Sequence, residues 1–259
     1  SAQRIGVHGN PPVTNYGLKD WSPIRYGSLD LTASGTIMDD SLCYDVFAQA
    51  AQAIRTPQSI NPLGNLHPKM ILAVGASQSA MRLVAYHNSI HNLHNIFDGY
   101  YMLVGGLGVR TDMNVKVFSY LSETDIALRP HLRIADSDTY RSWEVAATGH
   151  SSYVSDIYRT PLVLRDFRMT PWPPDCNKPP YSRVRGYDVI NASIDHLVRW
   201  IAKDIAPPIA PKIEFESISP PVIARDEFGM ALGGIRLPDV EAPIAVNTGI
   251  NSGATFCTL

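Results

Sequence analysis

The sequence predicts an α/β protein in which a mostly parallel sheet is flanked by helices. Short apolar runs alternate along the chain with segments whose apolar residues recur every three or four positions, which is the pattern of strands alternating with helices. The run at 70–74 is apolar at every position, as expected of a central parallel strand that is buried on both faces. No repeat of about 20–50 residues is visible, which argues against solenoid and propeller folds.

Composition and charge limit the classes of function. The chain of 259 residues is 45% hydrophobic and 18% charged, so it can bury a core and is not intrinsically disordered. Its 22 basic and 24 acidic residues give a formal charge of −2, which favours neither nucleic acid nor an anionic membrane surface as a partner. No apolar run approaches the roughly 20 residues that a membrane-spanning helix needs. The sequence does not decide the compartment.

The α/β core is expected over residues 1–211. The turn-rich segment 9–40 is typical of irregular loop, and six prolines between positions 161 and 180 indicate a second surface excursion. Helices of this core are expected over 41–55, 80–86 and 189–202. Strands are expected over 70–74, 97–104, 115–121 and 143–147.

The last part of the chain has a different pattern. Between residues 212 and 259, short apolar segments stand at 213–215, 222–224 and 244–246, and each has the length and alternation of a short strand. We therefore expect a small β-rich appendage over 212–259, as part of the same domain as the core.

The strongest chemical signal is Gly75-Ala76-Ser77-Gln78-Ser79, which lies between an expected strand and an expected helix. A serine hydroxyl becomes a useful nucleophile when a tight strand-to-helix turn presents it to a base. The usual pattern is Gly-x-Ser-x-Gly, because the positions two before and two after the serine crowd neighbouring backbone, and here the last position is Ser79. The pattern predicts Ser77 as nucleophile and the backbone N–H of Gln78 as an oxyanion donor; the alternative is a serine in an ordinary turn.

Two further residues stand where the partners of such a serine are expected. Asp125 follows the strand 115–121 by four residues, and His150 follows the strand 143–147 by three. Hydrolases that present a serine at such a turn have their acid and histidine in this order along the chain, each just past the end of a strand. Asp125 and His150 match both features. We expect the two to form a hydrogen-bonded chain with Ser77, with contacts of about 2.6–3.2 Å. Glu123 stays open as an alternative acid.

Several segments together resemble the alpha/beta hydrolase domain-containing esterase-like family. They are 25–29, 44–53, 75–80, 122–125, 143–150 and 233–238. The resemblance spans most of the chain and implies an α/β-hydrolase fold and a hydrolase, while it leaves the substrate open. Within this family, Ser79 in place of the usual glycine is normal.

These observations favour a serine hydrolase that cleaves a carboxylic ester. Ser77 would attack the acyl carbon, His150 would move its proton, and Asp125 would orient the imidazole and stabilise its cation. Such a reaction needs water and a small-molecule ester, with no metal or organic cofactor. Two alternatives stay open: a binding or assembly protein in which these residues are vestigial, and an acyltransferase that uses the same residues.

The histidines and cysteines suggest further roles. His87, His91 and His94 would share one face of a continuous helix, as zinc ligands do, but the polar residues among them favour a frayed helix end, and we expect no metal site. Cys176 and Cys257 both lie in loop-like segments, and a disulfide between them is expected to staple those segments. Cys43, at the start of an apolar helix, is expected to be a buried thiol.

The part of the sequence before Met70 is too short for all of the strands that are expected there. Folds of this kind place four strands and two helices before the strand that leads to the serine, yet 69 residues precede Met70, with space for about one strand near 4–7. The chain also stops in an apolar run at 255–259. A sheet without its first strands would expose an unpaired edge. We therefore expect the rest of the fold to come from residues outside this sequence or from another chain.

Overall fold

The computed structural model describes residues 19, 22–30, 33–37, 42–167, 176–177 and 181–252. The chain divides into two units, one of residues 1–71 with 90–97 and one of residues 72–89 with 98–259. Among the described residues, the first unit contains the helices α3 (Pro23–Tyr26), α4 (Cys43–Arg55) and α6 (His91–His94). The expected helix at 41–55 is therefore confirmed, and it ends where Thr56 precedes a proline. Within this unit the rings of Phe47 and Phe97 pack at 4.8 Å.

The second unit is built on four parallel strands, which confirms the predicted sheet. They are β1 (Leu72–Ala76), β2 (Gly99–Leu103), β3 (Lys116–Ser122) and β4 (Tyr140–Val145), paired in the order β1-β2-β3-β4. Since every pair is parallel, the carboxyl ends of all four strands meet at one edge. Among the described strands β1 is the outermost, and Val74 is 58% exposed, so the expectation of a central strand buried on both faces was wrong for the described part of the chain. The strand expected near residues 4–7 falls outside the described residues.

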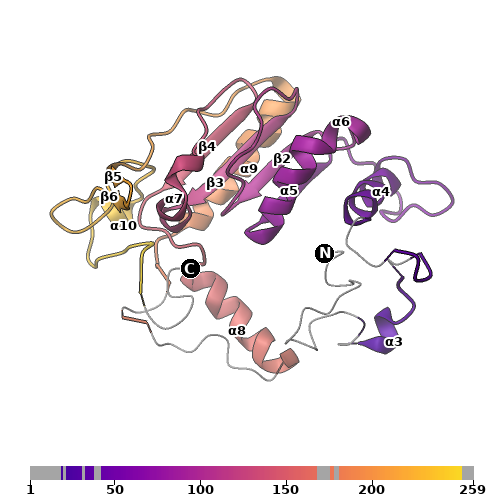
Figure 1. The fold of residues 1–259 in the computed structure, drawn as a ribbon, viewed down its shortest axis with the longest axis horizontal. Coiled ribbons are helices and arrows are strands. Elements are labelled where there is room, and N and C mark those ends of the chain that lie inside the picture. Colours follow the sequence, from indigo (N-terminus) through magenta and orange to yellow (C-terminus); the bar gives the residue numbers. More distant parts are fainter. Residues whose placement is uncertain are drawn as a thin grey trace. The chain divides into compact units, whose positions relative to one another are not determined.

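Helices α5 (Gln78–Ser89) and α9 (Gly186–Lys203) cover opposite faces of the sheet (Figure 1). Neighbouring residues of β2 show this, because successive side chains of a strand point to opposite faces. The ring of Tyr100 packs against Tyr86 of α5 at 6.4 Å, whereas the hydroxyl of Tyr101 lies 2.7 Å from Oγ of Ser193 in α9. Both expected helices are thus present, and α5 begins directly after Ser77, two residues earlier than predicted.

One hydrophobic cluster of the described residues lies between the sheet and α9. Its strand residues include Phe118 and Trp143, whose rings meet edge to face at 5.0 Å, and its helix residues include Leu197 and Trp200. All four are buried. Burial of each such side chain stabilises the fold by about 1.5–3 kcal/mol, which holds the sheet rigidly beneath the loops at its carboxyl edge.

The C-terminal part contributes β5 (Phe215–Ile218), β6 (Pro221–Ile223) and the short helix α10 (Pro238–Glu241). The two strands pair antiparallel, as expected for a small β-rich segment. The strand expected at 244–246 was wrong: Ile244 is fully exposed and Val246 is two-thirds exposed, so this segment has no sheet partner to cover it. The C-terminal part packs on the loop after β4, where Ala146 and Ala147 join Ile213 in a second buried cluster.

Helix α7 (Glu123–Leu128) and the 3₁₀ turn η1 (Pro130–Leu132) follow β3, and helix α8 (Tyr153–Phe167) follows β4. The irregular surface segment expected from 161 onward was wrong for residues 161–167, because α8 continues through Pro161. A proline inside a helix costs about 3 kcal/mol. Here Val154, Tyr158 and Leu162 recur every four residues, a spacing that favours a helix in spite of the proline. Residues 168–175 and 178–180 lie outside the described residues.

The remaining sequence expectations concern cysteines and membranes. Cys43 is in the thiol form but half-buried, so its expected full burial was wrong. Cys176 is disulfide-bonded, while Cys257 lies outside the described residues, so the pairing of these two stays a prediction. In the described part of the chain, no helix combines the length and apolar character that crossing a bilayer requires.

Candidate active site

Ser77 stands at the turn between β1 and α5, in a strained backbone conformation. Its φ of +55° lies in the left-handed region that residues with a side chain rarely adopt. Two backbone hydrogen bonds hold the turn: the Ser77 N–H donates to the carbonyl of Leu103 at 2.9 Å, and the Ser77 carbonyl accepts from Met81 at 3.1 Å. The neighbouring strand and the following helix therefore fix the direction of the serine side chain.

Glycine is required on one side of this turn and dispensable on the other. A Cβ added to Gly75 would lie 2.6 Å from the carbonyl oxygen of Ser79 and 2.9 Å from the nitrogen of Ala80, both of them backbone atoms. Ser79 itself is exposed, so its side chain has room. The close approach explains why this sequence keeps the first glycine of the usual pattern and replaces the second.

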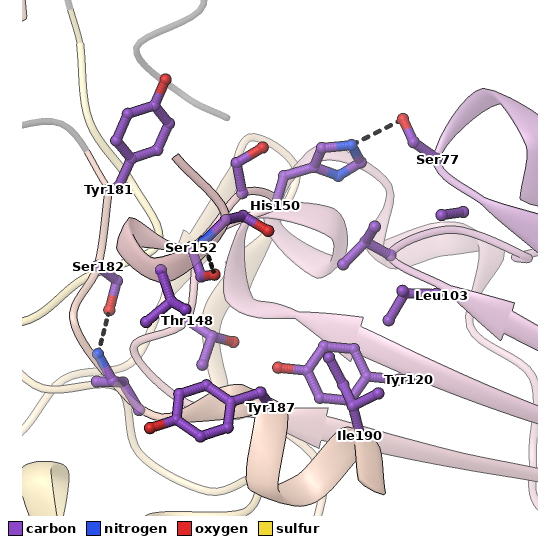
Figure 2. Close-up of a pocket in the computed structure, with 18 of the residues that line it drawn as sticks. Ser77, Leu103, Tyr120, Thr148, His150, Ser152, Tyr181, Ser182, Tyr187 and Ile190 are labelled. Atoms are coloured by element: carbon purple, nitrogen blue, oxygen red, sulfur yellow. Dashed lines mark hydrogen bonds between the residues drawn. The ribbon is translucent and has the colours of Figure 1, made fainter. Parts of the chain in front are cut away.

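The structure brings Ser77, His150 and Asp125 together at the carboxyl edge of the sheet. The Nε2 atom of His150 lies 2.8 Å from Oγ of Ser77, as Figure 2 shows, and its Nδ1 atom lies 2.7 Å from Oδ1 of Asp125. The three residues follow β1, β4 and β3 respectively, so three strand ends supply one chain of hydrogen bonds. Asp125 is buried and His150 is largely buried, which shields their contact from solvent.

Asp125 is held by a capping box at the start of α7. Its Oδ2 atom accepts from the backbone N–H and the hydroxyl of Ser122, and the Asp125 N–H points back to that hydroxyl. Ser122 therefore fixes one carboxylate oxygen and leaves the other to His150.

Glu123, the alternative acid, does not contact His150. Its buried carboxylate instead accepts from the backbone N–H of Ala147 and from Arg225 and Thr248 of the C-terminal part. Sequence reasoning did not single out Arg225 or Thr248, because nothing near them along the chain marks them as partners of Glu123.

Gln78 contributes a backbone N–H beside the serine. Gln78 is the first residue of α5, and the first N–H groups of a helix have no carbonyl partner within it. The helix dipole places partial positive charge at the same end. The N–H of Gln78 is thus available to an anionic oxygen next to Ser77.

A cavity of about 710 Å³ opens in front of Ser77 and His150. Strand ends, the loop 148–152, α8 and the start of α9 supply its walls (Figure 2). Burial raises the pKa of two of its phenols, Tyr120 and Tyr181, so both keep their protons at neutral pH. Among the described residues that line it, Arg159 supplies a permanent positive charge and no side chain is a carboxylate.

The three histidines considered as metal ligands do not lie on one helix. His87 belongs to α5, which ends at Ser89, whereas His91 and His94 belong to α6. Across the described ranges, no group of three or more histidine, cysteine, aspartate or glutamate side chains is placed to hold a metal ion.

A parallel sheet whose strand-to-helix turn presents a serine to a histidine is the architecture of the α/β-hydrolase class. In a comparison with protein-family models, the model described as alpha/beta hydrolase domain matches residues 1–259. The chain belongs to this family, as the resemblance had indicated, and membership supports a hydrolase-type function in general. Neither the curated proteins nor the solved structures that were searched gave a match.

Proposed function

We propose that this hydrolase cleaves carboxylic esters through a covalent acyl-enzyme on Ser77. The observation that carries the proposal is the chain of two hydrogen bonds from Ser77 through His150 to Asp125, at 2.8 and 2.7 Å. An ionised Asp125 only accepts hydrogen bonds, which places the ring proton of neutral His150 on Nδ1 and leaves Nε2 free to take a proton.

The first half of the reaction uses each of these groups once. Nε2 of His150 takes the proton of Ser77 as Oγ attacks the acyl carbon, and Asp125 stabilises the imidazolium that forms. The N–H of Gln78 donates to the oxyanion of the tetrahedral intermediate; loss of one such donor typically costs about 10²–10³ in kcat. As the intermediate collapses, His150 gives the proton to the departing alcohol.

In the second half of the reaction the same proton transfers occur with water as the nucleophile. His150 takes a proton from the water molecule, whose oxygen attacks the acyl carbon, and then returns that proton to Oγ of Ser77 as the acid leaves. The cavity of about 710 Å³ falls within the size range of small-molecule sites, so we expect esters of moderate size as substrates.

A panel of p-nitrophenyl esters of increasing chain length tests this proposal. We expect turnover by the wild-type protein and a loss of about 10⁴-fold or more in kcat for Ser77→Ala, with Ser79→Ala as the matched control in the same turn. A serine-directed fluorophosphonate should label Ser77 stoichiometrically. An unreactive Ser77 in the folded protein would instead indicate a binding protein, and a product ester formed with an added alcohol would indicate acyl transfer.

A further inference from the structure

The buried carboxylate of Glu123 joins the two loops that carry Asp125 and His150. Its Oε2 atom accepts from the N–H of Ala147 at 2.7 Å, and its own backbone N–H donates to the carbonyl of Thr148 at 3.1 Å. Glu123 lies two residues before Asp125, and Ala147 lies three residues before His150. The start of α7 and the loop after β4 are thus bonded to each other beside both functional side chains.

The charge of Glu123 is balanced from the C-terminal part of the chain. Nη2 of Arg225, 102 positions away, lies 2.6 Å from Oε1, and the hydroxyl of Thr248 donates to the same oxygen at 3.0 Å. Glu123 is fully buried, and among the described residues Arg225 is its ion-pair partner. A buried carboxylate without such a partner is strongly unfavourable, so the position of Glu123 depends on Arg225.

Gly249 also contacts both loops. Its carbonyl accepts from the hydroxyl of Thr124, and that hydroxyl in turn accepts from the N–H of His150 at 3.2 Å. A Cβ on Gly249 would lie 2.3 Å from the carbonyl oxygen of Thr148 and 2.9 Å from the nitrogen of Thr124. The C-terminal backbone therefore approaches the loops as closely as a glycine allows.

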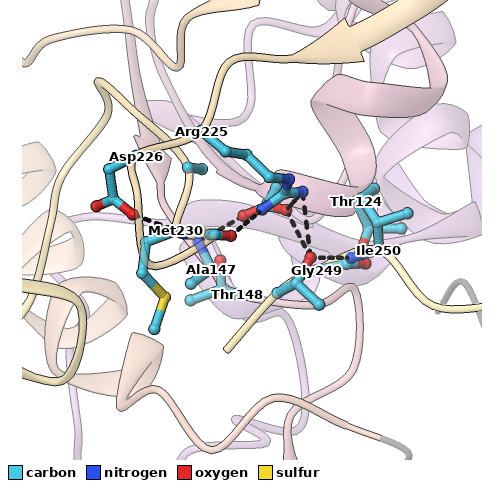
Figure 3. A network of polar contacts seen from close by, with 12 residues as sticks. Thr124, Ala147, Thr148, Arg225, Asp226, Met230, Gly249 and Ile250 are labelled. Atoms are coloured by element: carbon cyan, nitrogen blue, oxygen red, sulfur yellow. Dashed lines mark hydrogen bonds and ion pairs between the residues drawn. The ribbon is translucent and has the colours of Figure 1, made fainter. Parts of the chain in front are cut away.

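We call Arg225, Thr248 and Gly249 the C-terminal brace; Figure 3 shows Arg225 and Gly249 beside Thr124 and Ala147 of the two loops. We propose that Arg225 is a positioning residue for the hydrolytic reaction: through Glu123 it sets the geometry of Asp125 and His150 relative to Ser77. This inference rests on the proposed function. Arg225 does not belong to the described lining of the cavity, so it acts on the alignment of the reacting groups and leaves substrate binding unchanged.

The test is a kinetic comparison of Arg225→Met, Arg225→Lys and a matched control, Arg236→Met, in the full chain. Arg236 also lies in the C-terminal part, and its side chain is 18% exposed against 28% for Arg225. It pairs with Asp226 and Glu241, and no hydrogen bond among the described residues joins its side chain to either loop. Each variant is assayed with a p-nitrophenyl ester at a temperature where thermal unfolding shows that it is folded.

For Arg225→Met we expect kcat to fall by about 10²-fold with KM within about threefold of wild type, since a misplacement of about 1 Å has an effect of that size. Arg225→Lys should recover part of the loss, because it restores the charge without the planar guanidinium. Arg236→Met should lower the unfolding temperature and leave kcat of the folded protein unchanged.

An unchanged kcat in folded Arg225→Met would overturn the inference, and so would a parallel loss of kcat in Arg236→Met. If Arg225→Met does not fold, Arg225→Lys decides: a fall in kcat of about threefold or more at constant KM supports the positioning role, and an unchanged kcat rejects it. Failure of the proposed function has a different signature: the folded wild-type protein would then hydrolyse no ester, or hydrolysis would persist in Ser77→Ala.

Discussion

The Oδ2 atom of Asp125 lies 2.6 Å from the hydroxyl of Ser122 and 3.0 Å from its backbone nitrogen, while Oδ1 of the same carboxylate lies 2.7 Å from Nδ1 of His150. Both oxygens therefore have fixed partners, and the carboxylate cannot rotate without breaking the capping box of α7. This geometry gives Asp125 one orientation toward the imidazole.

Replacing Asp125 by asparagine should reduce kcat by about 10³–10⁴-fold. The amide can still accept one hydrogen bond, but it neither stabilises the imidazolium nor selects the tautomer with its proton on Nδ1. Steady-state hydrolysis of a p-nitrophenyl ester measures the effect, with circular dichroism as the check on folding. A variant that keeps its kcat within about threefold would remove Asp125 from the proposed mechanism.

Replacing Gly75 by alanine should displace the turn that holds Ser77. The added methyl group would lie 2.6–2.9 Å from backbone atoms of Ser79 and Ala80, which cannot rotate away as a side chain would. Overpacking of this kind costs about 1–3 kcal/mol. We expect a lower midpoint in urea unfolding and a loss of fluorophosphonate labelling at Ser77. Ser79→Ala is the control, and equal behaviour of the two variants would contradict the argument.

The charge of the cavity lining predicts a preference among esters. Arg159 is half-buried in the lining, and the described lining residues include no carboxylate. A hydrogen bond to a charged group contributes about 1.5–3 kcal/mol, so an ester with an anionic acyl group should gain roughly tenfold or more from this arginine.

The measurement compares kcat/KM for a p-nitrophenyl half-ester of a dicarboxylic acid with that for a neutral ester of equal length. Arg159→Gln should lower the ratio of the two values about tenfold. Arg183→Gln makes the same change of charge at an exposed position outside the described lining and should leave the ratio unchanged. An identical ratio in all three proteins would exclude an anion preference due to Arg159.

His87 should make the protein less stable in mild acid. Burial lowers the pKa of His87 below its usual 6.5, and the charge of Arg110 acts in the same direction. The hydrogen bond that Nδ1 of His87 donates to Oδ1 of Asn88 opposes both. Below about pH 6.5 His87 binds a proton in the unfolded chain but stays neutral in the folded chain. The contribution of neutral His87 to the free energy of unfolding is therefore present above about pH 6.5 and is lost as the pH falls toward the lower pKa of the folded state. The midpoint of thermal unfolding should therefore fall over that range. In His87→Gln this part of the pH dependence should be absent.

The elements that could be predicted are those with a local signal. Strand β1 and the turn at Ser77 are marked by a continuous apolar run followed by small residues, and Asp125 and His150 each stand a few residues past a strand. Parallel strands end at one edge of a sheet, so residues that stand just past several strands in the sequence lie close together in the fold.

The parts that could not be predicted depend on contacts across long stretches of chain. Arg225 lies 102 positions from Glu123, and nothing in its neighbourhood distinguishes it from a solvated arginine. The absence of a strand at 244–246 has the same origin: an apolar segment forms a strand where a partner is available, and the sequence does not show which partners remain. In α8 two local signals disagree: the spacing of the apolar residues favours a helix, whereas Pro161 disfavours one. The segment is helical.

The position of the C-terminal brace has a consequence for protein synthesis. Ser77, Asp125 and His150 all emerge from the ribosome well before Arg225 and Gly249. A nascent chain therefore carries the proposed nucleophile, acid and base for some time without the contacts that join their loops. On the proposed role of Arg225, these groups reach their final alignment only after position 249 has emerged.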